Sequence, residues 1–353
     1  PRSMPIPRFS ELCPATPGTR TGLAIVILIA ASGCDRTDVT SPLHGYASDL
    51  ASLAGTSPAG QSAFVPPGYP DAADRRLAGA DVRIGVGRFL DLRVCGLRHL
   101  VAERNSALGR LESDGLRLVY EHALLTGLTR CLETLEREGG DPALASDLRA
   151  ALDAKQRAAG TTLWNATLGS RELAGAYRVS GPPLDPTRSD PEPASALRGL
   201  AAAARGFGRP GAVLERDAHL GNLRVLERSG HGGRLAKATG RATEHLRAAT
   251  RYLRAIPCDA VPSPDLQAAR RRFEGGDIGR WLEGLVRSVK EWHQAVNELL
   301  SAQTASPPPG FLRYHARVMD MDNAQGLGPA LLSAIEDHRA AWQIAGPCST
   351  PES

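Results

Sequence analysis

The sequence predicts a mainly α-helical protein, an irregular multi-helix bundle of long antiparallel helical hairpins with few or no strands. Apolar residues recur three, four and seven positions apart along most of the 353-residue chain, which is the period of a helix face. Clusters of proline and glycine separate these periodic stretches. Strand-like alternation is confined to Val82–Val86, which fits a short strand or an extended lead into the first helix.

The first two expected helices form a hairpin. Apolar side chains fall on one helical face in Phe89–Leu111 and again in Leu116–Leu135. Between them, Ser113 is a candidate helix cap and Gly115 a turn residue. In an antiparallel pair that turns near residue 113, positions equally distant from that turn face each other.

More helices are expected along the rest of the chain. Pro142–Tyr177 is a third long helix with a kink near residues 160–162. Ser180–Pro193 is rich in proline and acidic residues and is expected to be an exposed linker or a domain boundary. Phe311–Val318 is expected to be extended. The remaining predicted helices are Ala194–Arg205, Leu214–Arg228, Arg234–Ala255, Leu266–Phe273, Ile278–Gln303 and Pro329–Ile344.

The beginning of the chain has the pattern of an export signal. Basic residues precede Gly22–Ala31, an apolar run too short to cross a bilayer as a helix, for which about 20 apolar residues are needed. Ala31–Cys34 then resembles a bacterial lipobox. Cys34 is therefore expected to carry lipid and to anchor the protein in the periplasm, with Asp35 favouring the inner membrane over the outer one. The alternative is a secreted protein whose signal contains a cysteine.

These patterns divide the chain into five parts. The C-terminal helical part, residues 194–353, is expected to pack with the three-helix part, residues 81–179, as one unit. The parts are a lipoprotein signal peptide (1–33), a lipidated and irregular lead-in (34–80), a three-helix part (81–179), a linker (180–193) and a C-terminal helical part (194–353).

The overall charge excludes one class of function. The chain carries 42 basic and 38 acidic residues, a formal net charge of +4. A nucleic-acid-binding domain would be strongly basic, so no nucleic-acid partner is expected. The predicted partners are the membrane, reached through the lipid on Cys34, and an envelope protein.

The cysteines predict a disulfide framework. Apart from Cys34, four cysteines follow the signal, and an even number in an exported protein favours disulfides. Cys95 and Cys131 are equally distant from the hairpin turn, so a bridge is expected between them, worth roughly 4 kcal/mol in the loop-entropy model. Cys258 and Cys348 each follow a proline at the end of a helical stretch and form the second expected pair. Four free buried thiols are the alternative.

A polar segment interrupts the first predicted helix. The hairpin geometry places Asn105 and Ser106 opposite Glu121 and Tyr120, and a third antiparallel helix could add further polar side chains. Such a cluster is either an internal hydrogen-bond network, which is the favoured interpretation, or a site for a polar ligand. Its residues are Glu103, Arg104, Asn105, Ser106, Tyr120, Glu121, Lys155, Trp164 and Asn165.

A basic stripe follows one predicted helix. It could lie against anionic lipid headgroups or an acidic partner, although a solvated helix face is the favoured interpretation. Its residues are Lys237, Arg241, Arg247, Arg251 and Arg254.

Metal, cofactor and catalytic motifs give no prediction. His293 and His338 lie in no zinc-ligand spacing, and Asp320–Asn323 lacks the glycine and ligand positions of a calcium loop. The sequence contains no nucleophile elbow or phosphate-binding loop. No metal, no cofactor and no catalytic residue are therefore expected.

Two segments resemble a known family. Cys95–Gly109, with its Glu-Arg-Asn-Ser segment, and Ala334–Cys348 are similar to the domain-of-unknown-function 3080 family of uncharacterised proteobacterial lipoproteins. The resemblance implies a lipidated envelope protein. It brings no activity, so no catalytic residue is carried over.

The expected function is that of a lipid-anchored periplasmic protein, a non-enzymatic binding or assembly component of the cell envelope. One alternative is a hydrolase of an envelope polymer, with Glu103 as the acid or base. The other is a carrier of a small or lipidic ligand, which would need an apolar cavity between helices.

Overall fold

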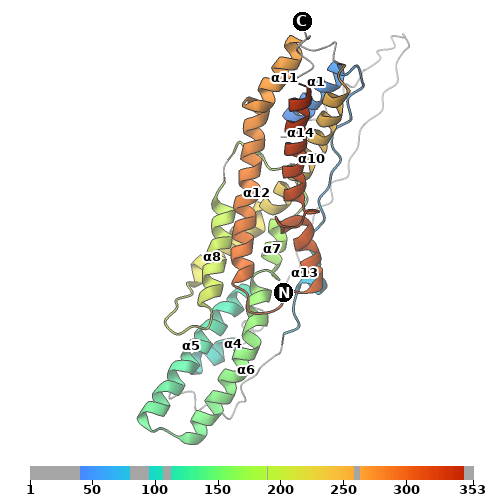
Figure 1. Ribbon diagram of the computed structural model, residues 1–353. Coiled ribbons are helices and arrows are strands. Elements are labelled where there is room, and N and C mark those ends of the chain that lie inside the picture. The colour runs from blue at the N-terminus through green and yellow to red at the C-terminus, as the bar shows by residue number, and fades with distance from the viewer. Residues whose placement is uncertain (1–39, 80–94, 106–112, 189, 258–262, 346–353) are drawn as a thin grey trace, which may run out of the picture. The chain divides into compact units, whose positions relative to one another are not determined.

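The computed structural model describes residues 40–79, 95–105, 113–188, 190–257 and 263–345. Within these ranges the chain is helical and forms no strand, which confirms the predicted fold class (Figure 1). Every described residue belongs to one compact unit of the chain, Thr37–Ser353. In that part of the chain, no helix is long and apolar enough to cross a membrane.

The described elements include five helices of 19 to 25 residues, joined to shorter ones. In chain order they are α1 (Ser41–Leu53), α2 (Ala72–Arg75), α4 (Arg98–Asn105), α5 (Asp114–Glu138), α6 (Pro142–Ala166), α7 (Arg171–Ala176), α8 (Glu192–Gly206), α9 (Arg216–Ser229), α10 (His231–Ala255), α11 (Pro264–Glu274), α12 (Asp277–Ser301), α13 (Pro309–Tyr314), the π-helical turn η4 (His315–Met319) and α14 (Leu327–Ala345).

Helices α5 and α6 form a long antiparallel hairpin that turns at residues 139–141, whereas the predicted hairpin joins Phe89–Leu111 to Leu116–Leu135 around residue 113. The hydroxyl of Ser113 caps α5 by accepting from the N–H of Leu116, as predicted. Gly139 ends α5 in the left-handed conformation with φ +67°, where a residue with a side chain is disfavoured. Asp141 then caps α6 through the N–H of Ala143. Local signals therefore fix the start of α5 and the turn between the two helices.

The main core lies among the C-terminal helices. Helix α10 packs against α14 and α1, while α12 packs against α8 and α11. Trp164, Trp292, Tyr46, Tyr177 and Phe311 are the largest fully buried aromatic side chains of this core. The indole N–H of Trp292 donates to the Tyr177 hydroxyl over 2.8 Å, so the polar atoms of these rings stay paired inside the core.

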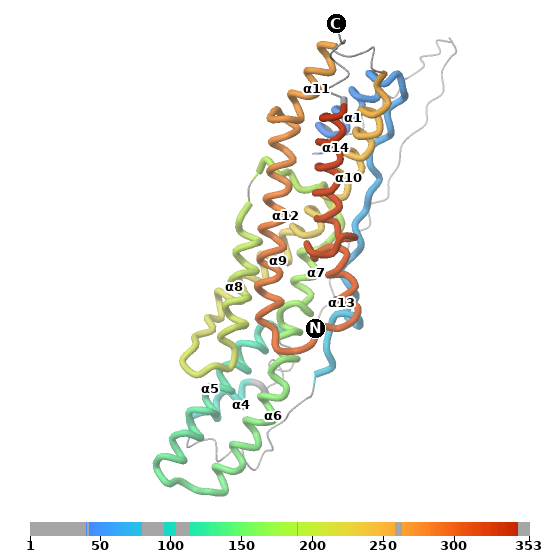
Figure 2. The backbone as a smooth tube through the Cα atoms, in the orientation of Figure 1, coloured from blue at the N-terminus to red at the C-terminus, as the bar shows by residue number. Residues whose placement is uncertain are grey.

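Residues 57–79, here called the strap, run along the helices with little secondary structure of their own (Figure 2). The Ala59 N–H donates to the Tyr252 hydroxyl on α10, and further along the Tyr69 hydroxyl donates to the carbonyl of Leu168 after α6, both over 2.7 Å. Gly240 of α10 lies so close to the ring of Phe64 that any side chain there would overlap it. Hydrogen bonds that involve tyrosine side chains of the strap and of α10 therefore hold this segment in place of the backbone ladder of a sheet.

Three predicted elements differ from the structure near the N-terminal side. The lead-in at 34–80 was expected to be irregular, but it contains α1. The helix Phe89–Leu111 is described only from Cys95 to Asn105, where Cys95–Leu97 are not helical because Gly96 has φ +67°. Pro142–Tyr177 is not one helix kinked at 160–162, since α6 continues to Ala166 and α7 begins only at Arg171.

Two further expectations concern the C-terminal side. Phe311–Val318 is helical in α13 and η4 instead of extended, because Phe311, Tyr314 and Val318 are buried at helical spacing. The segment Ser180–Pro193 is largely without helix, but Leu184 within it is buried and donates its N–H to the carbonyl of Arg234. It therefore packs against α10 at this point. Val82–Val86 lies outside the described residues.

Candidate functional site

A groove between α11, α12 and α14 is the largest apolar hollow among the described cavities. Its volume is about 720 Å³, within the range of 300 to 1,000 Å³ that is usual for small-molecule sites. We call it the α12–α14 groove. Its floor consists of the apolar side chains Phe273, Leu282, Val286, Leu332, Ile335 and Trp342.

The rim of the α12–α14 groove is charged. Arg270 and Glu274 pair with each other over 2.8 Å. Three further cations, Arg287, Lys290 and Arg339, have no ion pair or hydrogen bond within the described ranges, and all three are exposed. The carboxylates of Glu283 and Glu336 lie on the same rim. The groove therefore combines an apolar floor with cationic groups that are free to meet a negative charge.

Ion pairs fix the helices that form one wall of the groove. Arg272 on α11 donates to Asp277 in the first turn of α12 over 3.0 Å and to Asp49 on α1 over 2.9 Å. The guanidinium lowers the pKa of the Asp277 carboxyl by hydrogen bonding to its charged form. Gly275 and Gly276 make the tight connection between α11 and α12. This corner therefore sets the angle between two of the three helices that line the groove.

A buried polar network lies behind the floor residue Trp342. The Thr250 hydroxyl on α10 donates its only proton to the backbone carbonyl of Leu246 over 2.8 Å. It must therefore accept from Nδ1–H of His338, which lies 3.0 Å away. Nε2 of His338 is then the acceptor for the Tyr46 hydroxyl over 2.6 Å and the indole N–H of Trp342 over 3.1 Å. Burial lowers the pKa of His338 to about 4 and raises that of Tyr46. The network is complete with a neutral imidazole, which makes His338 a packing residue.

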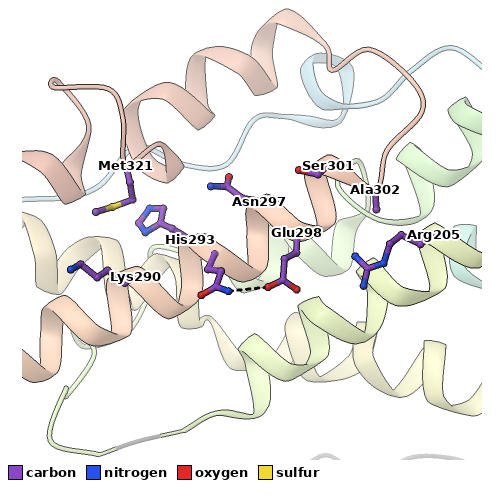
Figure 3. Close-up of a pocket in the computed structure, with 9 residues that line it drawn as sticks. Arg205, Lys290, His293, Asn297, Glu298, Ser301, Ala302 and Met321 are labelled. Carbon is purple, nitrogen blue, oxygen red and sulfur yellow. Dashed lines mark hydrogen bonds between the residues drawn. The ribbon is translucent and has the colours of Figure 1, made fainter.

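A second cavity, of about 610 Å³, lies along α12 and is lined by polar residues such as Arg205, Gln294 and Glu298 (Figure 3). Arg205 from α8 faces Glu298 from α12 in this view, and Gln294 donates to Glu298 over 3.3 Å. Both ring nitrogens of His293 contact backbone carbonyls, of Val289 over 2.6 Å and of Val318 over 3.0 Å. Both nitrogens of the His293 ring therefore already have hydrogen-bond partners. Groups of His, Cys, Asp or Glu able to hold a metal are absent from the described residues.

The predicted polar cluster separates into two arrangements. Glu121 on α5 and Lys155 on α6 form a buried ion pair over 2.8 Å, so the third helix does bring Lys155 to the hairpin. Glu103 is exposed on α4 and lines none of the three described cavities. The side chains of Arg104 and Asn105, and all of Ser106, lie outside the described residues, while Tyr120 is half-buried on α5.

Trp164 and Asn165 hold the strap instead of joining Glu121. The indole N–H of Trp164 donates to the carbonyl of Arg75 over 2.7 Å. The Asn165 amide accepts from the N–H of Leu77 over 2.9 Å and donates to its carbonyl over 2.8 Å. This pairing satisfies both backbone groups of Leu77, as a neighbouring strand would. These two residues therefore belong to a structural contact.

The disulfide predicted between Phe89–Leu111 and Leu116–Leu135 is present. Cys95 and Cys131 form a disulfide with their Cα atoms 5.4 Å apart, which confirms the predicted pair. Cys34, Cys258 and Cys348 lie outside the described residues.

Only part of the predicted basic stripe is open to solvent. Lys237 is half-buried and donates to the carbonyl of Gly181 over 2.7 Å, and Arg241 is also half-buried. Arg247, Arg251 and Arg254 are exposed on α10. Three arginines of the five predicted residues therefore remain as a surface patch.

Sequence reasoning missed the α12–α14 groove. Its floor residues follow the same helical period as the core, so nothing in the pattern of Val286 or Ile335 marks them as lining a hollow. The difference lies in their exposure, since both are only half-buried.

Comparisons with known proteins match the chain to a family of unknown function. A family model described as "Protein of unknown function (DUF3080)" matches residues 43–345. No curated protein matches the chain. No solved structure matches it.

Proposed function

The chain belongs to the DUF3080 family, and from that premise we propose that it is a lipid-anchored binding protein of the bacterial cell envelope, without enzymatic activity of its own. The export signal and the lipobox ending at Cys34 support the periplasmic address. The family match begins at residue 43, shortly after this cysteine. The α12–α14 groove is the observation that supports a binding role.

The chemistry of the groove favours one class of ligand. Its floor offers apolar surface to a hydrocarbon body, and burial of each methylene group is worth about 0.8 kcal/mol. Arg287, Lys290 and Arg339 on the rim could pair with an acidic head group. The ligand that fits both features is an anionic amphiphile such as a fatty acid or an acidic lipid. This favours the carrier alternative within the broader binding role.

The hydrolase alternative has no such support. Its candidate carboxylate, Glu103, is exposed and lines none of the three described cavities. A general acid or base needs a positioned partner and a substrate cleft. We therefore do not argue a catalytic role for it.

Lipidation can be tested by labelling cells that express the protein with radioactive palmitate. We expect the wild type to be labelled and to sediment with membranes, whereas Cys34→Ala should lose the label, since the thioether to lipid can form only on that thiol. Cys95→Ala serves as the matched control and should keep the label. An unlabelled wild type, or a labelled Cys34→Ala variant, would contradict the proposed anchor.

Binding in the groove can be tested by titrating the purified protein with oleate and following tryptophan fluorescence. We expect saturable binding by the wild type and at least a tenfold weaker affinity for Ile335→Glu, because the new carboxylate lies on the apolar floor. Ile344→Glu is the matched control, since Ile344 is 69% exposed on the same helix and does not line the groove. Its affinity should equal that of the wild type.

A second variant separates a folding defect from a binding defect. Arg287→Glu/Arg339→Glu reverses two exposed rim charges and should weaken oleate without changing the circular dichroism spectrum. Equal oleate affinity in all variants would exclude the carrier. If an envelope protein instead co-purifies with the wild type and not with Ile335→Glu, the groove is a docking site for a protein, and only the broader binding role stands.

A further inference from the structure

A third cavity, of about 310 Å³, lies between the strap, α5 and α6. It is separate from the α12–α14 groove, with which it shares no residue. We call it the Arg117 cavity. The side chains that matter for its chemistry are those of Arg76 from the strap, Asp114 and Arg117 from α5, and Thr161 and Thr162 from α6.

The charges of this cavity are unequally paired. Arg76 donates two parallel hydrogen bonds to Asp114, over 2.5 and 3.0 Å, so this cation and this carboxylate neutralise each other. The nearby carboxylate of Glu172 accepts from Arg171 over 3.0 Å. Arg117 has no ion pair and no hydrogen bond within the described ranges. One positive charge therefore remains in the cavity.

The lack of a hydrogen-bond partner is unusual for Arg117 because part of its guanidinium is buried. Its Nε atom is buried, and buried donors in folded proteins almost always have an acceptor. A guanidinium offers its N–H groups as a planar fork, which matches the oxygens of a carboxylate or a phosphate. The missing acceptor is therefore one that an anionic ligand could supply.

Two hydroxyl groups extend the same cavity. Helical threonines elsewhere in this protein, such as Thr239 and Thr250, donate to the carbonyl four residues earlier. Thr161 and Thr162 make no such hydrogen bond in the part of the chain that the structure describes, although both lie inside α6. Their hydroxyls can thus both donate to and accept from a ligand.

We propose that the Arg117 cavity is a binding site for a small hydroxylated anion, a compound of monosaccharide size that carries one carboxylate or phosphate group. Arg117 holds the anionic group, and the hydroxyls of Thr161 and Thr162 bind the polar remainder. The Arg76–Asp114 pair lines the same cavity and leaves the net charge of the cavity to Arg117. The cavity volume excludes a long hydrocarbon chain, which distinguishes this site from the groove.

The test is isothermal titration of the full protein in detergent with glucuronate, with inorganic phosphate, and with glucose as the uncharged probe. We expect saturable binding of at least one anion and none of glucose. Arg117→Gln should weaken that binding at least tenfold, and Thr161→Val/Thr162→Val should weaken glucuronate more than phosphate. Arg247→Ala removes an exposed arginine from α10 and should leave every affinity unchanged.

Thermal unfolding separates binding from a structural role. Because Arg117 has no partner in the described structure, Arg117→Gln should keep the melting temperature of the unliganded protein and lose only the rise that the anion causes. Binding of glucuronate alone would identify a carboxylate site, and binding of phosphate alone a phosphate site. The proposal fails if neither anion binds saturably, or if Arg117→Gln binds as the wild type does.

Discussion

Acidification from pH 7 to pH 4 is expected to lower the free energy of unfolding by several kcal/mol, because three buried histidines resist protonation in the folded state. Burial lowers the pKa of His219, His231 and His338 to about 4. In the unfolded chain a histidine titrates near pH 6.5. Between these values the unfolded state binds more protons, so stability falls as the pH falls.

The size of this effect follows from the separation of the two pKa values. Each of the three histidines contributes roughly 3 kcal/mol of stability at neutral pH that is lost between about pH 6.5 and 4. Neighbouring carboxylates offset part of the pKa lowering by burial: Glu172 raises the pKa of His219, and Asp190 raises that of His231. Burial is the largest cause in all three.

His219 provides the sharpest test of the acid effect. Neither of its ring nitrogens has a hydrogen-bond partner within the described ranges, so an apolar side chain of similar size loses no contact there. His219→Leu should unfold at a higher urea concentration than the wild type at pH 5, and by a smaller margin at pH 7. His99→Leu, on the exposed surface of α4, is the control and should follow the wild-type pH dependence. Parallel pH curves for the wild type and His219→Leu would refute the assignment.

Glu121→Ala is expected to destabilise the protein by about 3–5 kcal/mol, the cost of leaving a buried charge without its partner. Glu121 and Lys155 are 8% and 9% exposed, so water cannot replace the lost carboxylate at Lys155. The measurement is the free energy of unfolding from urea denaturation followed by circular dichroism. The same two helices offer a control in Glu136, whose ion pair with Arg149 is about half exposed. Glu136→Ala should cost less than about 1 kcal/mol.

A double variant tests whether the loss comes from the unpaired charge. Glu121→Leu/Lys155→Met replaces the ion pair by apolar side chains, which is often neutral or stabilising at buried positions. We expect it to recover most of the stability that Glu121→Ala loses. If the double variant is as unstable as the single one, shape and not charge accounts for the loss.

The disulfide between Cys95 and Cys131 was predictable because its signal is local. Ser113 caps α5 as expected, and Cys95 and Cys131 are equally distant from that position along the chain. The same reasoning could have found α1. Leu43, Tyr46, Ala47 and Leu50 have the helical period, but they lie in a segment whose serines, glycines and prolines favour irregular structure.

The sites were less predictable because their partners come from distant parts of the chain. Asn165 was predicted to lie in a polar cluster with Glu121, but its partner is the backbone of Leu77, which has no sequence signal. The α12–α14 groove depends on the gap between two helices, and periodicity does not report gaps. Arg117 is one arginine among many, and only the structure shows that its neighbours leave it unpaired.

The strap and α1 also determine the order in which the chain can complete its fold. Tyr46 contacts His338, 292 residues later, and Ala59 contacts Tyr252, 193 residues later. A ribosome releases the N-terminal segments first, so their native partners do not yet exist when they emerge. The hairpin of α5 and α6, with its local contacts, can form as soon as both helices are available. Docking of α1 and the strap must wait for α10 and α14, so the part of the chain made first is among the last to reach its native contacts.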